Sequence, residues 1–248
     1  MIGVALWLCP KTNTPVYDKL TTVMSSLNTL FPGQPPKFEP HITITTNISI
    51  DLDDKAKTKD DVDKILSASA VAMSSLPKNH ESLVKVGKVN SQRKFFKKLY
   101  FEVEKDPNLV SFARIIRELF VIVPQDIEKE NMKHNPHLYT TDSHGNTVKR
   151  RPSRRKSGTP PKVEEFDTTE IQRAATYKAA EWSIDEYDPH ISLVYSDLWP
   201  IHSALWRNIN SRVSDIDWDV DWEFNVLKLV LCEGDVNDWI VLGSVDIH

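Results

Sequence analysis

Two seven-residue segments of this 248-residue chain match each other in residue type at every position, and this repeat constrains the fold more than any other feature. The first copy, Phe38–Ile44, reads Phe-Glu-Pro-His-Ile-Thr-Ile, and the second, Tyr187–Leu193, reads Tyr-Asp-Pro-His-Ile-Ser-Leu. In both copies an aromatic residue, an acidic residue and a proline precede an alternating run that is typical of a strand. A predicted helix and a predicted pair of strands follow each copy, so the pattern predicts two related β/α units.

The pattern of apolar residues predicts the elements around these two strands. A buried opening strand at residues 2–9 is expected to end at Pro10. Apolar residues at helical spacing predict helices, and short apolar or alternating runs predict strands. The predicted helices are residues 16–30, 60–76, 107–122, 166–180 and 201–213, and the further predicted strands are residues 83–89, 98–103, 224–232 and 239–245.

Residues 125–165 lack periodicity and include a run rich in charge and proline, so we interpret them as a mobile basic surface insertion within a single domain of residues 1–248. Residues 142–165 carry seven Lys or Arg and three Asp or Glu. Because the net charge of the chain is −4, the remainder is strongly acidic. Such a body is a poor nonspecific binder of long nucleic acid, whereas a small anion in a dedicated pocket is compatible with it.

The sequence offers no signal for a membrane or for secretion. No stretch approaches the roughly 20 consecutive apolar residues that a membrane span needs, and the apolar opening Ile2–Leu8 lacks a basic region before it. The two cysteines, Cys9 and Cys232, are expected to be buried thiols in a reducing compartment, because a chain of this size needs no disulfide. We therefore expect a soluble cytosolic monomer.

The repeat brings two kinds of reactive side chain onto one face of each predicted strand. Because side chains alternate along a strand, His41 and Thr43 share a face, and so do His190 and Ser192. If the two units face each other, two imidazoles and two hydroxyls surround one small anion. A single His-x-Thr would be an ordinary strand histidine, but two copies inside a matching frame favour a catalytic site.

These groups suit the hydrolysis of a cyclic phosphodiester. A neutral histidine takes a proton from water, while a protonated histidine gives one to the departing ribose oxygen. The hydroxyls of Thr43 and Ser192 donate hydrogen bonds to the nonbridging oxygens, whose negative charge must be held as phosphorus becomes five-coordinate. The scheme requires no metal and no cofactor, and the expected partner is a small cyclic phosphate substrate.

Paired His-x-Ser/Thr motifs in two β/α units resemble the 2H phosphoesterase family. With the motif spacing, the length, the opening run Ala5–Pro10 and the basic insertion, the resemblance covers essentially the whole chain. It implies an α+β, bilobal fold in which two pseudo-symmetric lobes of antiparallel sheet, with outer helices, surround a central cleft. It also implies that His41, Thr43, His190 and Ser192 are catalytic, with His41 as the acid and His190 as the base.

The resemblance also implies a substrate. Family members cleave the bond to the 3′ oxygen of nucleoside 2′,3′-cyclic phosphates and leave a 2′-phosphate, and they act on ADP-ribose 1″,2″-cyclic phosphate, a by-product of tRNA splicing. In similar plant enzymes, aromatic residues at the positions of Trp7 and Tyr195 hold the substrate, and stacking on a base or ribose is physically reasonable. Strict alternation puts Tyr195 on the opposite face from His190, so the strand must bend before Tyr195. Alternatively, Trp7 is a core residue.

Two rival functions stay open at this stage. An RNA-end phosphodiesterase or a ligase of 2′,5′ RNA ends would use a similar fold on polynucleotides, which the acidic body disfavours. A noncatalytic module would keep the cleft and only bind cyclic phosphate ends, which the intact hydroxyls beside both histidines disfavour.

Other polar features have simpler explanations. His134 and His137 resemble a pair of metal ligands, but no further Cys or His lies close to them in the sequence. Asp51, Asp53 and Asp54 lack the glycine and the closing glutamate of a calcium loop and are expected to form a solvated turn.

The basic run at residues 149–156 fits several functions. It resembles an RNA-binding or nuclear-address segment, and it would present Ser153 and Ser157 to a basophilic kinase. A run of this kind is more often a solvated surface, which is the interpretation we adopt.

Overall fold

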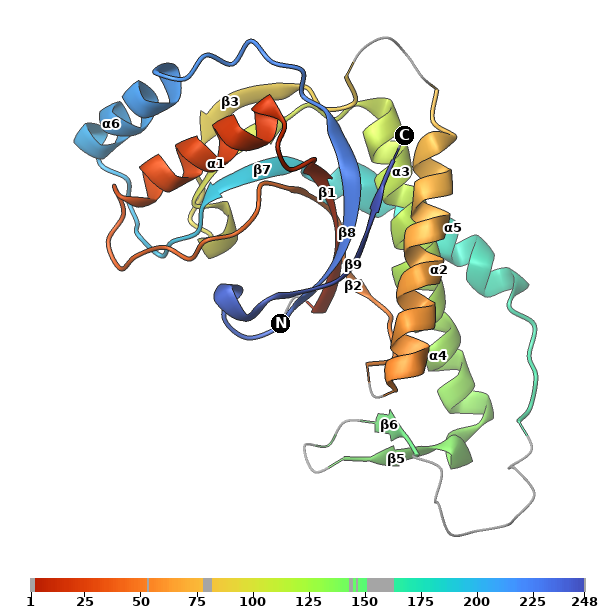
Figure 1. Ribbon diagram of the computed structural model, residues 1–248. Coiled ribbons are helices and arrows are strands. Elements are labelled where there is room, and N and C mark those ends of the chain that lie inside the picture. Colours follow the sequence, from red (N-terminus) through yellow and green to blue (C-terminus); the bar gives the residue numbers. More distant parts are fainter. Residues whose placement is uncertain are drawn as a thin grey trace.

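The computed structural model describes residues 3–52, 54–77, 82–142, 145, 147–150 and 163–247. An antiparallel sheet occupies its centre, with strands in the order β3-β4-β7-β2-β1-β8-β9 (Figure 1). These strands are β1 (Gly3–Pro10), β2 (Ile42–Ile48), β3 (Val86–Asn90), β4 (Leu99–Val103), β7 (His190–Val194), β8 (Phe224–Cys232) and β9 (Ile240–Asp246). Every predicted strand is confirmed, with small shifts at the ends, and the fold is of the α+β class.

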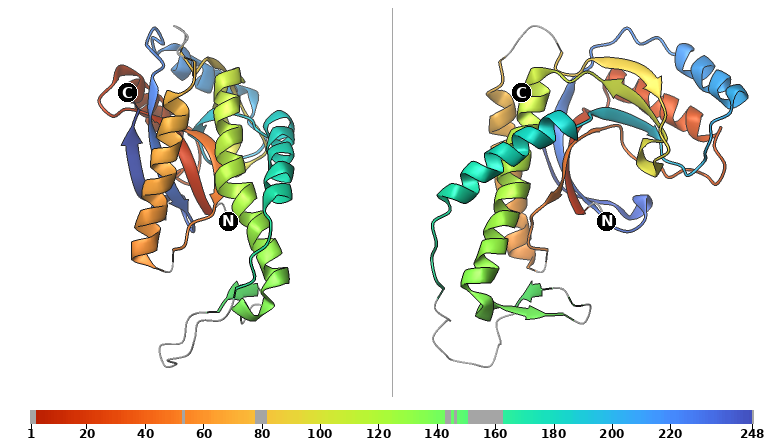
Figure 2. Two further views of the ribbon diagram at one scale, coloured as in Figure 1. Left: turned by 90° about the vertical axis from the view of Figure 1, so that its right-hand side faces the viewer. Right: turned by 180° about the vertical axis from the view of Figure 1, so that it is seen from behind.

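Helices cover the sheet in two groups. They are α1 (Pro15–Asn28), α2 (Lys55–Ser74), α3 (Pro107–Arg117), α4 (Val123–His134), α5 (Thr169–Asp185) and α6 (Ser203–Ser214). Figure 2 shows α2, α3 and α5 side by side: α2 packs on β8 and β9, α3 packs on β2, and α5 packs on α3. In the other group, α1 packs on β7 and on α6. None of the helices in the described residues is long and apolar enough to cross a membrane.

The predicted repeat of elements is confirmed. The first motif strand, β2, is followed by α2 and the β3–β4 hairpin, and the second, β7, is followed by α6 and the β8–β9 hairpin. Each hairpin lies away from its own motif strand, because β4 pairs with β7 while β8 pairs with β1, the neighbour of β2. The two units are therefore interleaved in one sheet.

The two motif strands meet at the middle of the sheet. Their register consists of one residue pair, Ile42 opposite Ile191, and both side chains are fully buried. Figure 1 shows the sheet bending strongly at this place, with β3, β4 and β7 turned away from β1, β8 and β9. The brief contact lets the strands diverge while the residues next to the isoleucines stay close.

Local sequence explains why the first helix forms where it does. The Thr14 hydroxyl caps α1 by accepting a hydrogen bond from the amide of Tyr17, and Pro15 occupies the first helical turn. The inward stripe of α1 belongs to the core that lies between the helices and the sheet. Its buried residues are Val16, Leu20, Val23, Met24 and Leu27.

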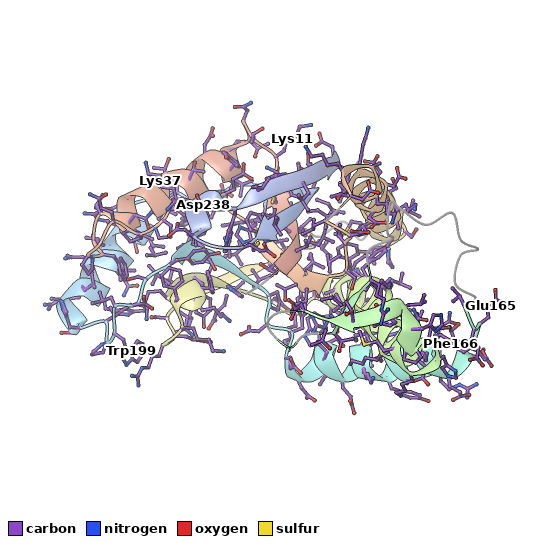
Figure 3. The ribbon with its side chains drawn as sticks, turned by 90° about the horizontal axis from the view of Figure 1, so that it is seen from below. Lys11, Lys37, Glu165, Phe166, Trp199 and Asp238 are labelled. Carbon is purple, nitrogen blue, oxygen red and sulfur yellow. The ribbon has the colours of Figure 1, made fainter. Side chains whose placement is uncertain are left out.

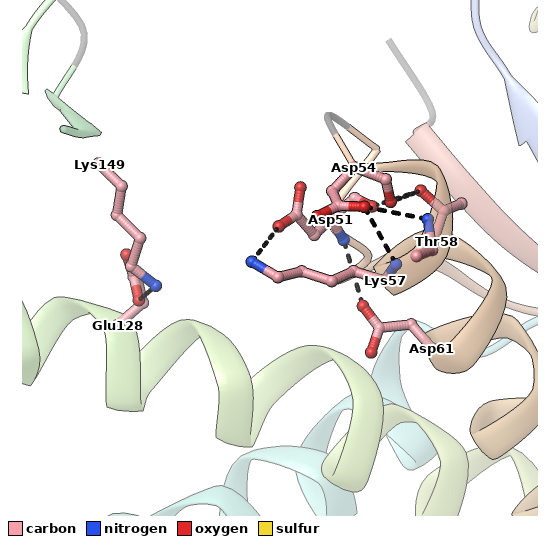
Figure 4. A network of polar contacts seen from close by, with 8 residues as sticks. Asp51, Asp54, Lys57, Thr58, Asp61, Glu128 and Lys149 are labelled. Atoms are coloured by element: carbon pink, nitrogen blue, oxygen red, sulfur yellow. Dashed lines mark hydrogen bonds and ion pairs between the residues drawn. The ribbon is translucent and has the colours of Figure 1, made fainter. Parts of the chain in front are cut away.

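The acidic turn before α2 is a helix cap. The carboxylate of Asp54 accepts hydrogen bonds from the first amides of the helix, and the Thr58 hydroxyl donates to the Asp51 carbonyl (Figure 4). Lys57 pairs with the Asp51 carboxylate, and the Asp61 carboxylate accepts from the Asp51 amide. These contacts explain why α2 begins five residues before the predicted start, in a polar stretch without an apolar stripe.

Residues 125–134 of the predicted insertion are helical. Helix α3 continues through a π-helical turn, Glu118–Ile122, into α4, and a hairpin of β5 (Tyr139–Thr141) and β6 (Thr147–Lys149) follows. The sequence of α4 carries no apolar stripe, and none of its side chains is fully buried. Polar contacts hold this region instead: Lys178 pairs with Asp126, and Lys149 pairs with Glu128 (Figure 4).

Part of the insertion, and one of the acidic residues discussed above, lie outside the described residues. Residues 151–162, with Ser153 and Ser157, and also Asp53, are in this group. The mobility expected for residues 125–165 stays a prediction.

His134, the first of the two histidines of the insertion, has structural neighbours. The ring of His134 stacks on Phe166 with 5.0 Å between ring centroids, and its Nε2 lies 3.4 Å from a carboxylate oxygen of Glu130. In Figure 3, Phe166 lies at one end of the molecule and Trp199, shortly before α6 in the chain, lies at the other end. The stack of His134 on Phe166 is therefore far from Trp199. No group of three metal-binding side chains occurs among the described residues.

One stability prediction follows from the packing of α2 on β9. A Cβ atom at Gly243 would lie 2.6 Å from Val62 Cγ1 and 3.0 Å from Leu66 Cδ1. Gly243→Ala should therefore lower the free energy of unfolding by about 1–3 kcal/mol, the usual effect of overpacking. Urea unfolding would measure the loss, with Ser244→Ala as the control on the same strand. A Gly243→Ala protein as stable as the wild type would contradict this account of the interface.

Candidate active site

All six residues singled out from the sequence line one cavity of about 180 Å³. The lining residues are Ala5, Trp7, His41, Thr43, Thr46, Phe96, Lys97, His190, Ser192, Tyr195, Cys232 and Trp239. Larger hollows of about 570–600 Å³ occur elsewhere on the described surface, but the residues that line them include neither His41 nor His190. The chemistry of the lining, rather than its size, identifies this cavity as the candidate site.

The contact between β2 and β7 explains how the two histidines come together. His41 directly precedes Ile42 and His190 directly precedes Ile191, and these isoleucines face each other in the sheet. Because neighbouring side chains on a strand point to opposite faces, burial of both isoleucines in the core turns both imidazoles to the cavity side.

Each imidazole is held by the same backbone contact. Nδ1 of His41 lies 2.6 Å from the Glu39 carbonyl oxygen, and Nδ1 of His190 lies 2.8 Å from the Asp188 carbonyl oxygen. A carbonyl only accepts hydrogen bonds, so Nδ1 is the donor in both rings. In the neutral imidazole the other nitrogen, Nε2, then carries the lone pair, and it is the nitrogen left for proton transfer.

Burial makes both imidazoles weak bases. Burial lowers the pKa of His41 to about 4, and the nearby His190 and Lys228 lower it further. The hydrogen bond to the Glu39 carbonyl acts in the opposite direction and raises this pKa. Burial also lowers the pKa of His190 to about 4, with Lys97 as an additional cause. Both rings are therefore neutral at pH 7 in the free protein, and a bound anion would favour the charged form of either one.

The two predicted aromatic residues line the cavity, but protein rings already cover part of each. Trp7 stacks on His41 with 3.7 Å between centroids and 7° between planes. Tyr195 stacks on Phe38 at 3.8 Å and 11°. Trp7 and Tyr195 are only 4% and 3% exposed. Trp7 supports the imidazole directly through the stack, and because it is buried it is also a core residue, as in the alternative interpretation. Strand β7 ends at Val194, which allows Tyr195 to reach the face of His190 as expected.

The two hydroxyls are not in equivalent states. Ser192 Oγ donates to the carbonyl oxygen of Phe96 at 3.0 Å. The Thr43 hydroxyl has no hydrogen-bond partner among the described residues and is free to donate to a ligand. Ser192 must rotate away from the carbonyl before it can do the same.

Sequence reasoning missed three lining residues that come from the two hairpin turns. Phe96 and Lys97 belong to the short helical turn before β4, and Trp239 follows the equivalent turn before β9. Phe96 is 38% exposed and is therefore far more accessible to a ligand than Trp7 or Tyr195. Two adjacent phenylalanines inside a basic turn were the signal available in the sequence.

Comparison with known proteins identifies the class. Residues 1–247 match the family described as "Cyclic phosphodiesterase-like protein", and the chain belongs to this family. The resemblance inferred from the paired motifs is thereby confirmed.

Individual relatives match over nearly their whole length. A Candida albicans protein named 2′,3′-cyclic-nucleotide 3′-phosphodiesterase is 82% identical over 247 residues, covering 100% of both chains. Proteins of the same name from Debaryomyces hansenii and Saccharomyces cerevisiae are 63% and 26% identical, over 92% and 99% of this chain and 100% of each relative.

Acid is expected to destabilise the fold through the two histidines. Their pKa is about 4 in the folded chain against an ordinary 6.5, so the unfolded chain binds more protons between these values. The stability from neutral imidazoles is complete above pH 6.5 and falls as the pH drops toward 4, by about 1 kcal/mol per pH unit for each ring. Urea unfolding at about pH 7 and pH 5 measures the slope.

A double variant isolates this contribution. His41→Gln/His190→Gln should lose less stability on acidification than the wild type, whereas the control His134→Gln should follow the wild type, because His134 lies outside the cavity. An equally steep loss in the double variant would show that other groups cause the acid sensitivity.

Proposed function

We propose that this chain is a 2′,3′-cyclic-nucleotide 3′-phosphodiesterase that hydrolyses nucleoside 2′,3′-cyclic phosphates to 2′-phosphates. One observation carries the proposal: two imidazoles, each with Nδ1 bonded to a backbone carbonyl, line the same small cavity. The family and the names of the relatives support the reaction class.

The proposed mechanism uses the two imidazoles in opposite protonation states. His190, neutral, accepts a proton from the attacking water at Nε2, while His41, protonated, gives a proton from Nε2 to the departing 3′ oxygen. This assignment of acid and base comes from the family resemblance. Because burial keeps both rings neutral in the free protein, the negative charge of the bound cyclic phosphate would stabilise the imidazolium form of the acid.

The hydroxyls act on the nonbridging oxygens. Thr43 is available in its present state, and Ser192 would exchange the Phe96 carbonyl for a phosphate oxygen. Donors that meet the developing charge in a site with little water stabilise the transition state more than they would in bulk water. Trp7 would keep the His41 ring in place, and Tyr195 would border the substrate.

Further parts of the proposal rest on the family resemblance. They are hydrolysis of ADP-ribose 1″,2″-cyclic phosphate to ADP-ribose 1″-phosphate, a role in processing by-products of tRNA splicing, and a bilobal arrangement in which each motif strand belongs to one pseudo-symmetric lobe. A monomer in the cytosol also remains our expectation, in agreement with two buried, unpaired thiols, Cys9 and Cys232.

The central test is replacement of the imidazoles. His41→Ala and His190→Ala should each reduce turnover of adenosine 2′,3′-cyclic phosphate by about two to four decades, with smaller losses for Thr43→Ala and Ser192→Ala. Chromatography that separates the 2′-phosphate from the 3′-phosphate gives rate and bond choice together, and activity should survive a chelator. His134→Ala serves as the control, and wild-type turnover in either cavity variant would end the two-imidazole scheme.

A second test asks whether the basic run belongs to the site. The backbone of Glu164 exchanges two hydrogen bonds with the Asn135 amide, so the replaced segment should end before that residue. Substituting an uncharged Gly-Ser segment of equal length for residues 151–162 should leave turnover of a mononucleotide substrate nearly unchanged. A loss greater than about tenfold would make this segment part of the substrate site.

A further inference from the structure

The acidic position of the repeat performs two tasks in both copies. The carbonyl of Glu39 binds His41 Nδ1, and its carboxylate accepts a hydrogen bond from Lys228 Nζ at 2.5 Å. Asp188 repeats the arrangement: its carbonyl binds His190 Nδ1, and its carboxylate is paired with Lys97. The mechanism described above uses the carbonyls and leaves the two ion pairs without a role.

Each lysine comes from the unit opposite to the histidine it serves. Lys228 lies in β8, behind the second motif, and its ion pair reaches the first motif. Lys97 lies in the turn before β4, behind the first motif, and its ion pair reaches the second. The same reciprocal pairing at two independent places in the chain argues for a shared purpose.

Burial identifies the lysines as the inner members of these pairs. The side chains of Lys97 and Lys228 are 11% and 15% exposed, whereas those of Asp188 and Glu39 are 61% and 38% exposed. An ammonium group with so little contact with water needs a charged partner, so each carboxylate is drawn to a fixed position. The carbonyl of the same residue is then fixed as well.

In each copy, an aromatic ring that contacts the histidine also lies near the lysine. Lys97 Nζ lies 4.5 Å from the centre of the Tyr100 ring, which meets His190 edge to face at 5.4 Å. Lys228 lies opposite Trp7 in the register of β1 and β8, and Trp7 stacks on His41.

We infer that Lys97 and Lys228 are positioning residues of the active site, which hold Asp188 and Glu39 so that each histidine keeps Nδ1 on a backbone carbonyl and offers Nε2 to the substrate. The inference rests on the proposed function. Groups that orient a histidine through a hydrogen bond typically change activity by about 10–100-fold when they are removed.

The charged neighbours of each imidazole define what a lysine substitution does to its pKa. His190 is surrounded by Lys97, Lys94 and Asp188, with burial as the largest cause of its low pKa. His41 is surrounded by His190 and Lys228. Loss of either lysine cation removes a repulsion and releases a carboxylate, and both changes favour the charged imidazole, so the pKa of the served histidine should rise.

Kinetics provide the first part of the test. Lys97→Gln and Lys228→Gln should each lower kcat for adenosine 2′,3′-cyclic phosphate by about 10–100-fold while KM changes less than about threefold. The acid limb of the pH profile should move to higher pH. Lys97→Arg and Lys228→Arg should restore most of the activity, and the control Lys105→Gln, whose ammonium donates to the Ile184 carbonyl at the surface, should leave kcat unchanged.

Nitrogen-15 NMR of the imidazoles provides the second part and requires no turnover. In the wild type at about pH 7 both cavity histidines should appear as the Nδ1–H tautomer, and Lys97→Gln should convert His190 to a mixture without affecting His41, with the reverse for Lys228→Gln. Unchanged tautomers and pH profiles in folded Gln variants would overturn the inference. A wild type that shows these tautomers but does not hydrolyse the substrate would instead refute the proposed function.

Discussion

The structure depends on the contact of two buried isoleucines at the centre of the sheet. Ile42 and Ile191 form the register between β2 and β7, and their burial decides which way the preceding residues point. A shift of either strand by one residue would turn its histidine into the core and its isoleucine into the cavity. The free energy of core packing therefore enforces the geometry of the site, although neither isoleucine has any chemistry of its own.

Placing two imidazoles in an apolar cavity has an electrostatic consequence. Burial lowers the pKa of both rings, so both are neutral in the free protein, and the proposed mechanism requires one of them to gain a proton when the substrate binds. A cyclic phosphate bound between the rings would stabilise the protonated form through its negative charge. Under the proposed mechanism, the same burial that weakens the bases would make proton uptake depend on the substrate, and Trp7 covers one face of His41, the proposed acid.

The sequence was sufficient for the strands, most of the helices and the two histidines, because each depends on a short repeat or a local period. It was not sufficient for α4, where no side chain is fully buried and no stripe exists to be recognised. Nor did it reveal Lys97 or Trp239, because only the folded sheet brings the hairpin turns to the cavity. The stacking partners of Trp7 and Tyr195 were hidden for the same reason: alternation gives a side chain its face but not its neighbour.

The interleaving of the two units explains why these hidden residues lie where they do. Because β4 pairs with β7, the turn before β4 carries Lys97 to Asp188, and because β8 pairs with β1, Lys228 reaches Glu39. Each histidine is thus supplied by one unit and supported by the other. A single unit, however well folded, would hold a histidine whose acidic neighbour has no lysine, so the complete site can form only when both hairpins have joined the sheet.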